Sequence, residues 1–170
     1  MAYATKKQQP RLLLPLQTPD YVIEVLAAFG LITLITLAAV YYAELLEKIP
    51  THFGPDGRPD GFGDKNAVWF LPVLGAVMYA FMTYINRRPD WFNYPVKITP
   101  ENAERQYRLG TRFVGGLKAF IMLLFAYLVW GTIGTATGKW QGLHWWVIPI
   151  VFVTTLGNIF YFHYKSLARK

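Results

Sequence analysis

The segment IPTHFGPDGRPDGFGDK, residues 49–65, separates two long apolar runs and is the most turn-rich part of the chain. Its glycines allow backbone angles that other residues rarely adopt. Its prolines are incompatible with a regular helix or a central strand. Because the segment is too short to be a domain, we expect a compact loop whose shape is set by its turn residues and by the elements beneath it.

The chain on either side of this segment is strongly apolar. Hydrophobic residues make up 54% of the 170 residues and charged residues only 16%, whereas charged residues reach about a quarter in soluble domains. The apolar residues form four runs, at about 21–43, 67–86, 113–135 and 143–163, each long enough to cross a hydrocarbon core of ~30 Å. The sequence therefore predicts one all-α domain, residues 1–170, which is an integral membrane four-helix bundle.

The distribution of basic residues predicts the orientation of these spans. Of the 17 Lys and Arg, 13 lie at the N-terminus, between Arg87 and Lys118, or in the C-terminal tail. An excess of Lys and Arg marks the cytoplasmic side of a membrane protein. We therefore expect both termini and the loop 87–112 in the cytoplasm, the loop 44–66 outside, and a multi-pass protein of the bacterial inner membrane. The net charge of +7 then reflects cytoplasmic loops near anionic lipid rather than nucleic-acid binding.

The predicted cytoplasmic loop ends in the polar, helix-prone segment ENAERQYRLGTR, residues 101–112. Its arginines are spaced to share one helix face. The pattern predicts an amphipathic helix before the third span or continuous with it. The residues expected to contact lipid or a partner on this side are Arg87, Arg88, Arg105, Arg108 and Arg112.

The charged residues near the spans are expected at the span ends. Thr18 is the predicted cap of the first helix, Asp20 and Glu24 fall in its first turns, and Lys118 is counted with the cytoplasmic residues. The interior of the spans is then expected to carry no Asp, Glu, Lys or Arg. Pumps, proton-coupled transporters and intramembrane hydrolases usually place such groups at mid-depth. This expectation favours a non-enzymatic protein without catalytic residues.

Cysteine and histidine give no support for a bound cofactor. The chain has no cysteine, which excludes disulfides and thiolate-ligated metals. Histidine is a common haem ligand, but no two of His52, His144 and His163 are spaced to face one cofactor on one helix. A position at the membrane interface is the preferred interpretation of these histidines, and no cofactor is predicted.

The acidic residues of the loop are also weighed as a cation site. Asp56, Asp60 and Asp64 recur every four residues, and Ca²⁺ prefers such oxygens, but the EF-hand register is missing. We expect turn formation instead, with Arg58 and Lys65 as partners of the acids, and no metal. The loop residues expected to bind a partner or ligand are Pro50, His52, Phe53, Asp56, Arg58, Asp60, Asp64 and Lys65.

The loop and its flanks resemble a bacterial membrane-protein family of unknown function. The pattern is Ile/Leu-Pro-x-His-Phe, a glycine, an Asp-x-x-Gly-like turn, a lysine, and a helix with an early proline. The matching positions are Ile49, Pro50, His52, Phe53, Gly57, Asp60, Gly63, Lys65 and Pro72. Such a domain is similar to the one at the N-terminus of immunity proteins against a sporulation-delaying toxin, which also hold a repressor at the membrane. The resemblance implies a similar fold and topology and, as an activity, toxin immunity or signalling.

Two functions are therefore expected from the sequence. The first is a non-enzymatic accessory subunit of a larger bacterial membrane complex, such as a respiratory or photosynthetic one, which acts by helix packing and loop docking. The alternative is a toxin-immunity or signal-transducing receptor whose outer loop binds a peptide. The expected partners are the lipid bilayer and other membrane proteins, without nucleic acid.

Overall fold

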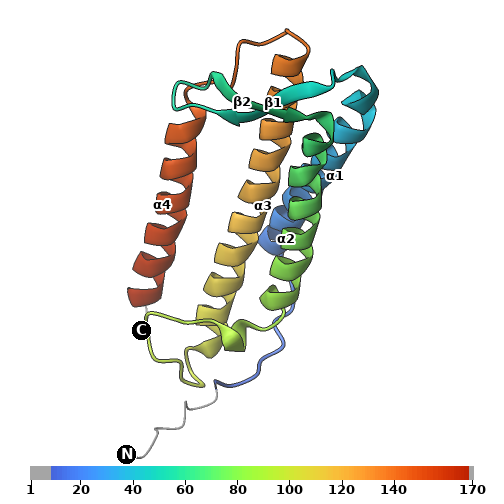
Figure 1. Cartoon of the computed structure of the whole chain (residues 1–170). Helices are drawn as coiled ribbons and strands as arrows, with labels where there is room; N and C mark the ends of the chain where they lie inside the picture. Colours follow the sequence, from blue (N-terminus) through green and yellow to red (C-terminus); the bar gives the residue numbers. More distant parts are fainter. Residues whose placement is uncertain (1–8, 169–170) are drawn as a thin grey trace, which may run out of the picture.

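Four long helices and a small β-hairpin make up the computed structural model, which describes residues 9–168 (Figure 1). The helices run alongside one another, and the hairpin lies across one end of them. Their bounds are Thr18–Tyr41 for α1, Phe70–Asn86 for α2, Ala103–Ala136 for α3 and Val147–Leu167 for α4. Among the described residues, four helices are long and apolar enough to cross a membrane. The predicted fold class is confirmed, and the chain is a multi-pass membrane protein.

Helix α3 is the central helix. Its 34 residues correspond to about 51 Å, so it is much longer than a hydrocarbon core of ~30 Å. It packs against α1, α2, α4 and the hairpin, whereas α4 packs mainly on α3 and stands apart from α1 and α2 (Figure 1). The predicted amphipathic segment is continuous with the third span, without a break at its glycines.

Helices α1 and α3 approach each other closely at Gly30. A Cβ atom added to Gly30 would lie 2.9 Å from the backbone nitrogen of Leu123 and 2.9 Å from the Cβ of Met122. Small residues permit such close backbone approach between membrane helices. Toward the hairpin end, this contact continues into an apolar core formed by Leu34, Ala38, Leu45, Ile49, Val68, Ala126, Val129 and Ile133.

The segment between the first two spans, which we predicted to be a compact loop shaped by its turn residues, is a β-hairpin. Strand β1 (Lys48–Phe53) pairs antiparallel with β2 (Pro59–Asp64), and the register is irregular around His52. Both strands of a two-stranded ribbon are edge strands, so proline is tolerated in them. Short 3₁₀ turns flank the hairpin, with η1 at Tyr42–Glu44 and η2 at Lys65–Trp69.

Two predicted boundaries also differ from the structure. Helix α1 includes Thr18, and Gln17 is its cap, with the Gln17 N–H donating to the Asp20 carboxylate at 2.8 Å. Helix α4 begins at Val147, later than the predicted 143. The predicted amphipathic helix begins at Ala103, after a 3₁₀ turn η3 at Pro89–Trp91. The late start of α4 has a tertiary cause, because residues 137–146 are held against α3 and the hairpin.

Candidate functional site

The tip of the hairpin is joined to the connection between α3 and α4. The Leu143 N–H donates to the Gly57 carbonyl at 2.8 Å. Gly57 has a φ of +81°, and a Cβ added to it would lie 2.1 Å from the Leu143 carbonyl oxygen. From the other side, a Cβ on Gly142 would lie 2.3 Å from the Gly57 carbonyl oxygen. The connection 137–146 therefore lies at the same end of the bundle as the hairpin and is bonded to its tip.

We expect Gly57→Ala to destabilise the protein by about 2–4 kcal/mol, because it combines left-handed backbone strain with a clash that breaks the bond to Leu143. Gly138→Ala is the matched control. Gly138 has a φ of +72° with nothing within 4 Å of an added Cβ, so only the strain of about 1–2 kcal/mol applies. The measurement is unfolding in mixed micelles, with amide exchange at Leu143. Equal losses for both variants would mean that the Gly57 contact contributes nothing.

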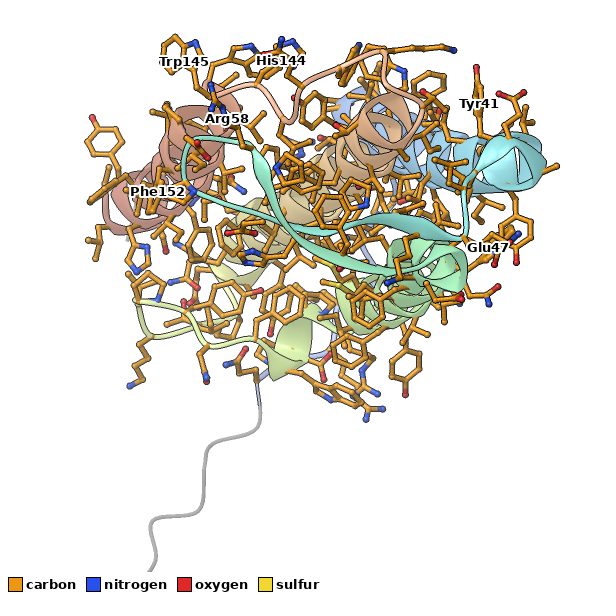
Figure 2. The ribbon with its side chains drawn as sticks, turned by 45° about the horizontal axis from the view of Figure 1, so that its top comes forward. Tyr41, Glu47, Arg58, His144, Trp145 and Phe152 are labelled. Atoms are coloured by element: carbon orange, nitrogen blue, oxygen red, sulfur yellow. The ribbon has the colours of Figure 1, made fainter. Side chains whose placement is uncertain are left out.

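Aromatic side chains hold the same connection on α3. Trp140 packs over Gly134, where an added Cβ would lie 2.9 Å from its ring, and stacks edge-on against Trp130 at 4.4 Å between ring centroids. His144 lies 2.9 Å from the Tyr127 hydroxyl through Nδ1. Figure 2 shows His144 and Trp145 on this connection near Arg58 at the hairpin tip, with Glu47 at the far end of the hairpin. His144 is thus a packing residue at the hairpin end of the bundle.

An apolar cavity of about 390 Å³ lies beneath β1, between α2 and α3. We call it the hairpin cavity. Its lining comes from three elements that are distant in sequence, namely β1, the η2–α2 junction and α3. The residues that line it are Ile49, Pro50, Thr51, Phe53, Ala67, Val68, Phe70, Leu71, Leu128, Val129 and Thr132. Since none of them is ionisable, the cavity suits an apolar group and offers no acid–base chemistry.

The predicted loop residues are distributed over the hairpin rather than gathered in one site. His52 contacts Asp60 across the strands, and the Asp64 carboxylate accepts from the Asn66 N–H at 2.8 Å, capping η2. Pro50 and Phe53 line the hairpin cavity.

Only one of the two cations expected to pair with the loop acids does so. Arg58 lies 3.8 Å from the Asp56 carboxylate. Lys65 instead pairs with Glu47 at 2.8 Å, which corrects the expectation that its partner is an aspartate. Within residues 9–168, no group of three or more His, Asp or Glu side chains is placed to hold a metal ion.

A charged pair joins α1 to α3, contrary to the expectation of spans without ionisable residues. The Lys118 ammonium, whose side chain is 1% exposed, lies 2.7 Å from the Glu24 carboxylate and donates to the Thr83 hydroxyl at 2.8 Å. The Tyr79 hydroxyl donates to the other Glu24 oxygen at 2.5 Å. Glu24 is about 9 Å along α1 from Thr18, so the pair lies near the predicted cytoplasmic end of the bundle. The sequence contains a signal for this pair, because an acid in span one and a lysine in span three each imply a charged or polar partner.

The five arginines predicted to contact lipid or a partner are of two kinds in the structure. Three of them have internal acidic partners. Arg88 binds Asp90 at 2.9 Å, Arg108 binds Glu104 at 3.0 Å, and Arg112 binds Asp20 at 2.8 Å. The hydrogen bonds from Arg88 hold the pKa of Asp90 below its usual range. Arg87 is exposed, and Arg105 has buried nitrogen atoms without a hydrogen-bond partner.

Arg105 borders a second, more polar cavity of about 560 Å³ at the predicted cytoplasmic end. We call it the arginine pocket. It lies between residues 95–102, the first turn of α3 and the end of α4. The residues that line it are Pro95, Val96, Lys97, Thr99, Glu101, Asn102, Arg105 and Leu167. A hydrogen bond from Thr99 lowers the pKa of Glu101.

Comparisons with known proteins give matches to only part of the chain. The model of a family described as "Domain of unknown function (DUF1648)" matches residues 28–76, from the middle of α1 through the hairpin into α2. The match covers well under half of the chain. It confirms that this part of the chain is similar to a family of unknown function, and it supports nothing more specific. No solved structure matches the chain significantly.

One relative is an "Uncharacterized protein" of the archaeon Archaeoglobus fulgidus. It is 37% identical over 62 residues, which cover 32% of this chain and 34% of the relative. The chain thus spans about a third of the length of the relative that it matches.

Proposed function

We propose that this protein is a non-enzymatic accessory subunit of a larger membrane complex, which binds another membrane protein through α4. The observation that carries the proposal is an apolar face of α4 with a gap at its centre. A Cβ added to Gly157 would have nothing within 4 Å, and the side chains one and two turns away on the same face are exposed. These are Val153 at 72%, Phe160 at 69%, Tyr161 at 59% and Tyr164 at 68%.

A glycine between large apolar side chains is suited to receive a side chain or a close backbone from another helix. Since α4 packs mainly on α3, its other faces are free for such a partner. The absence of ionisable side chains from the hairpin cavity supports a binding role over a catalytic one. The Glu24–Lys118 pair lines neither the hairpin cavity nor the arginine pocket.

The test is extraction of the full chain from its native membrane in mild detergent, followed by a native gel and mass spectrometry of co-migrating proteins. We expect the wild type to migrate with defined partners and Gly157→Leu to lose them, because leucine fills the gap. Val25→Leu is the control, since Val25 is 66% exposed on α1 and this substitution leaves α4 unchanged. Migration of the wild type as a lone 19.5 kDa protein, or full retention of partners by Gly157→Leu, would overturn the proposal.

A second candidate function is an outer receptor for an extended peptide, the immunity-type activity that the sequence resemblance implies. It is favoured by the hairpin, which has two unpaired strand edges, and by the apolar cavity directly beneath β1. A bound peptide could add a strand to the hairpin and place an apolar side chain in the cavity. Asp60→Asn and Lys65→Gln distinguish the two functions. Loss of peptide resistance with the complex intact supports the receptor, whereas unchanged resistance in both variants, together with loss of the complex in Gly157→Leu, supports the subunit.

A further inference from the structure

Arg105 is a charged side chain whose hydrogen-bond donors are partly unsatisfied. Its Nε and Nη2 atoms are buried and have no hydrogen-bond partner among the described residues. A guanidinium group cannot lose its proton under ordinary conditions, and burying its donors without acceptors carries a substantial free-energy cost. An acceptor from outside the chain would remove this cost.

The surroundings of Arg105 favour an anionic acceptor. Lys97 and Arg105 bring two positive charges to the arginine pocket, whereas Glu101 is the one acid among the described residues that line it. The pocket also lies at the start of α3, which begins at Ala103. The N-terminus of a long helix carries partial positive charge and N–H groups without intrahelical acceptors, and both favour an anion.

The length of α4 leads us to expect the arginine pocket at the depth where a bilayer carries its phosphate groups. Helix α4 has 21 residues, or about 31 Å, which matches a hydrocarbon core of ~30 Å. Its last turn should therefore lie at the inner boundary, and Leu167 of that turn lines the pocket. The Ser166 hydroxyl donates to Gln106 at 2.6 Å, and the Gln106 amide donates to the Ser166 carbonyl at 3.1 Å. These bonds hold the end of α4 beside the first turns of α3.

We propose that the arginine pocket binds a phosphate group through Arg105 and Lys97. The planar guanidinium group presents parallel donors that match two phosphate oxygens. The phosphate could belong to the headgroup of an anionic phospholipid or to a soluble phosphate compound, since both present the same oxygens. Arg88, Arg108 and Arg112 do not offer this site, because each already binds a carboxylate of the chain. The proposal is independent of the partner-binding role of α4.

The experiment uses the full chain in nanodiscs made of phosphatidylcholine alone or with phosphatidylglycerol. Native mass spectrometry after release measures the retained phosphatidylglycerol, and calorimetry measures binding of inorganic phosphate in the phosphatidylcholine discs. We expect Arg105→Gln to weaken the phosphate-bearing ligand by about tenfold or more, as for loss of hydrogen bonds to a charged group. Arg87→Gln removes the same charge from an exposed arginine outside the pocket and should retain wild-type binding.

The two measurements distinguish the source of the phosphate. Selective retention of phosphatidylglycerol that depends on Arg105 identifies a lipid headgroup, whereas Arg105-dependent binding of inorganic phosphate without lipid selectivity identifies a soluble ligand. Equal binding by the wild type and Arg105→Gln in both measurements would overturn the proposal, as would an equal loss in Arg87→Gln. If Arg105→Gln does not fold, Lys97→Gln replaces it. Lys97 is exposed, and unchanged binding in that variant would overturn the proposal in the same way.

Discussion

Glu24→Gln is expected to destabilise the protein by about 3–5 kcal/mol, because it leaves the Lys118 ammonium buried without a counter-charge. The Lys118 side chain is 1% exposed, so water cannot replace the lost carboxylate, whereas the Glu24 side chain is 46% exposed. Lys118→Met should therefore cost less, about 1–3 kcal/mol. The remaining carboxyl group lies at the bundle surface and still accepts from the Tyr79 hydroxyl. The measurement is unfolding in mixed micelles of increasing denaturing-detergent fraction, followed by circular dichroism.

The double variant Glu24→Gln/Lys118→Met tests whether the pair acts as a unit. It removes both charges, and replacement of a buried ion pair by groups of similar volume is often close to neutral. We expect it to be more stable than Glu24→Gln alone, with a coupling energy above ~1 kcal/mol. A double variant as unstable as the sum of the two single variants would show that the pair is not coupled. A greater loss for Lys118→Met than for Glu24→Gln would contradict the argument from burial.

Gly30→Ala is expected to destabilise the protein by about 1–3 kcal/mol, because the added methyl group forces α1 away from α3 or distorts both helices. The contact at 2.9 Å is with the Leu123 backbone nitrogen and the Met122 Cβ, and neither atom is the flexible end of a side chain. The same unfolding measurement gives the free-energy change. Cross-linking between cysteines introduced into α1 and α3 would report the increased separation.

Gly157→Ala is the matched control for this substitution. It also replaces a helical glycine by alanine in a predicted span, but nothing lies within 4 Å of the added Cβ. The gain in helix propensity, about 1 kcal/mol at most, is then unopposed, and the variant should be as stable as the wild type or slightly more stable. If both substitutions had the same effect, the close approach of α1 and α3 at Gly30 would not limit their packing.

The hairpin shows which features could and could not be predicted from the local sequence. Glycine and proline in residues 49–65 indicated departure from regular structure, and they did not reveal that the two halves pair as strands. Pro50 and Pro59 lie in β1 and β2, where the rule against proline does not apply because both strands are edges. The apolar core beneath the hairpin supports the pairing: Ile49 of β1 is 1% exposed and packs in it. Burial of this kind is a property of the assembled bundle.

The sequence by itself determined the four spans, because a helix in lipid satisfies its backbone hydrogen bonds within its own segment, and its apolar length is therefore readable locally. It also identified the basic residues from which the orientation is predicted. Only the tertiary structure decided which charges meet. Lys118 and Glu24 are 94 positions apart, and their pairing depends on how α1 and α3 are rotated and aligned. The same holds for Arg105 and Arg112, which share a predicted helix face. Arg112 meets Asp20 of α1, whereas the Nε and Nη2 atoms of Arg105 have no hydrogen-bond partner among the described residues.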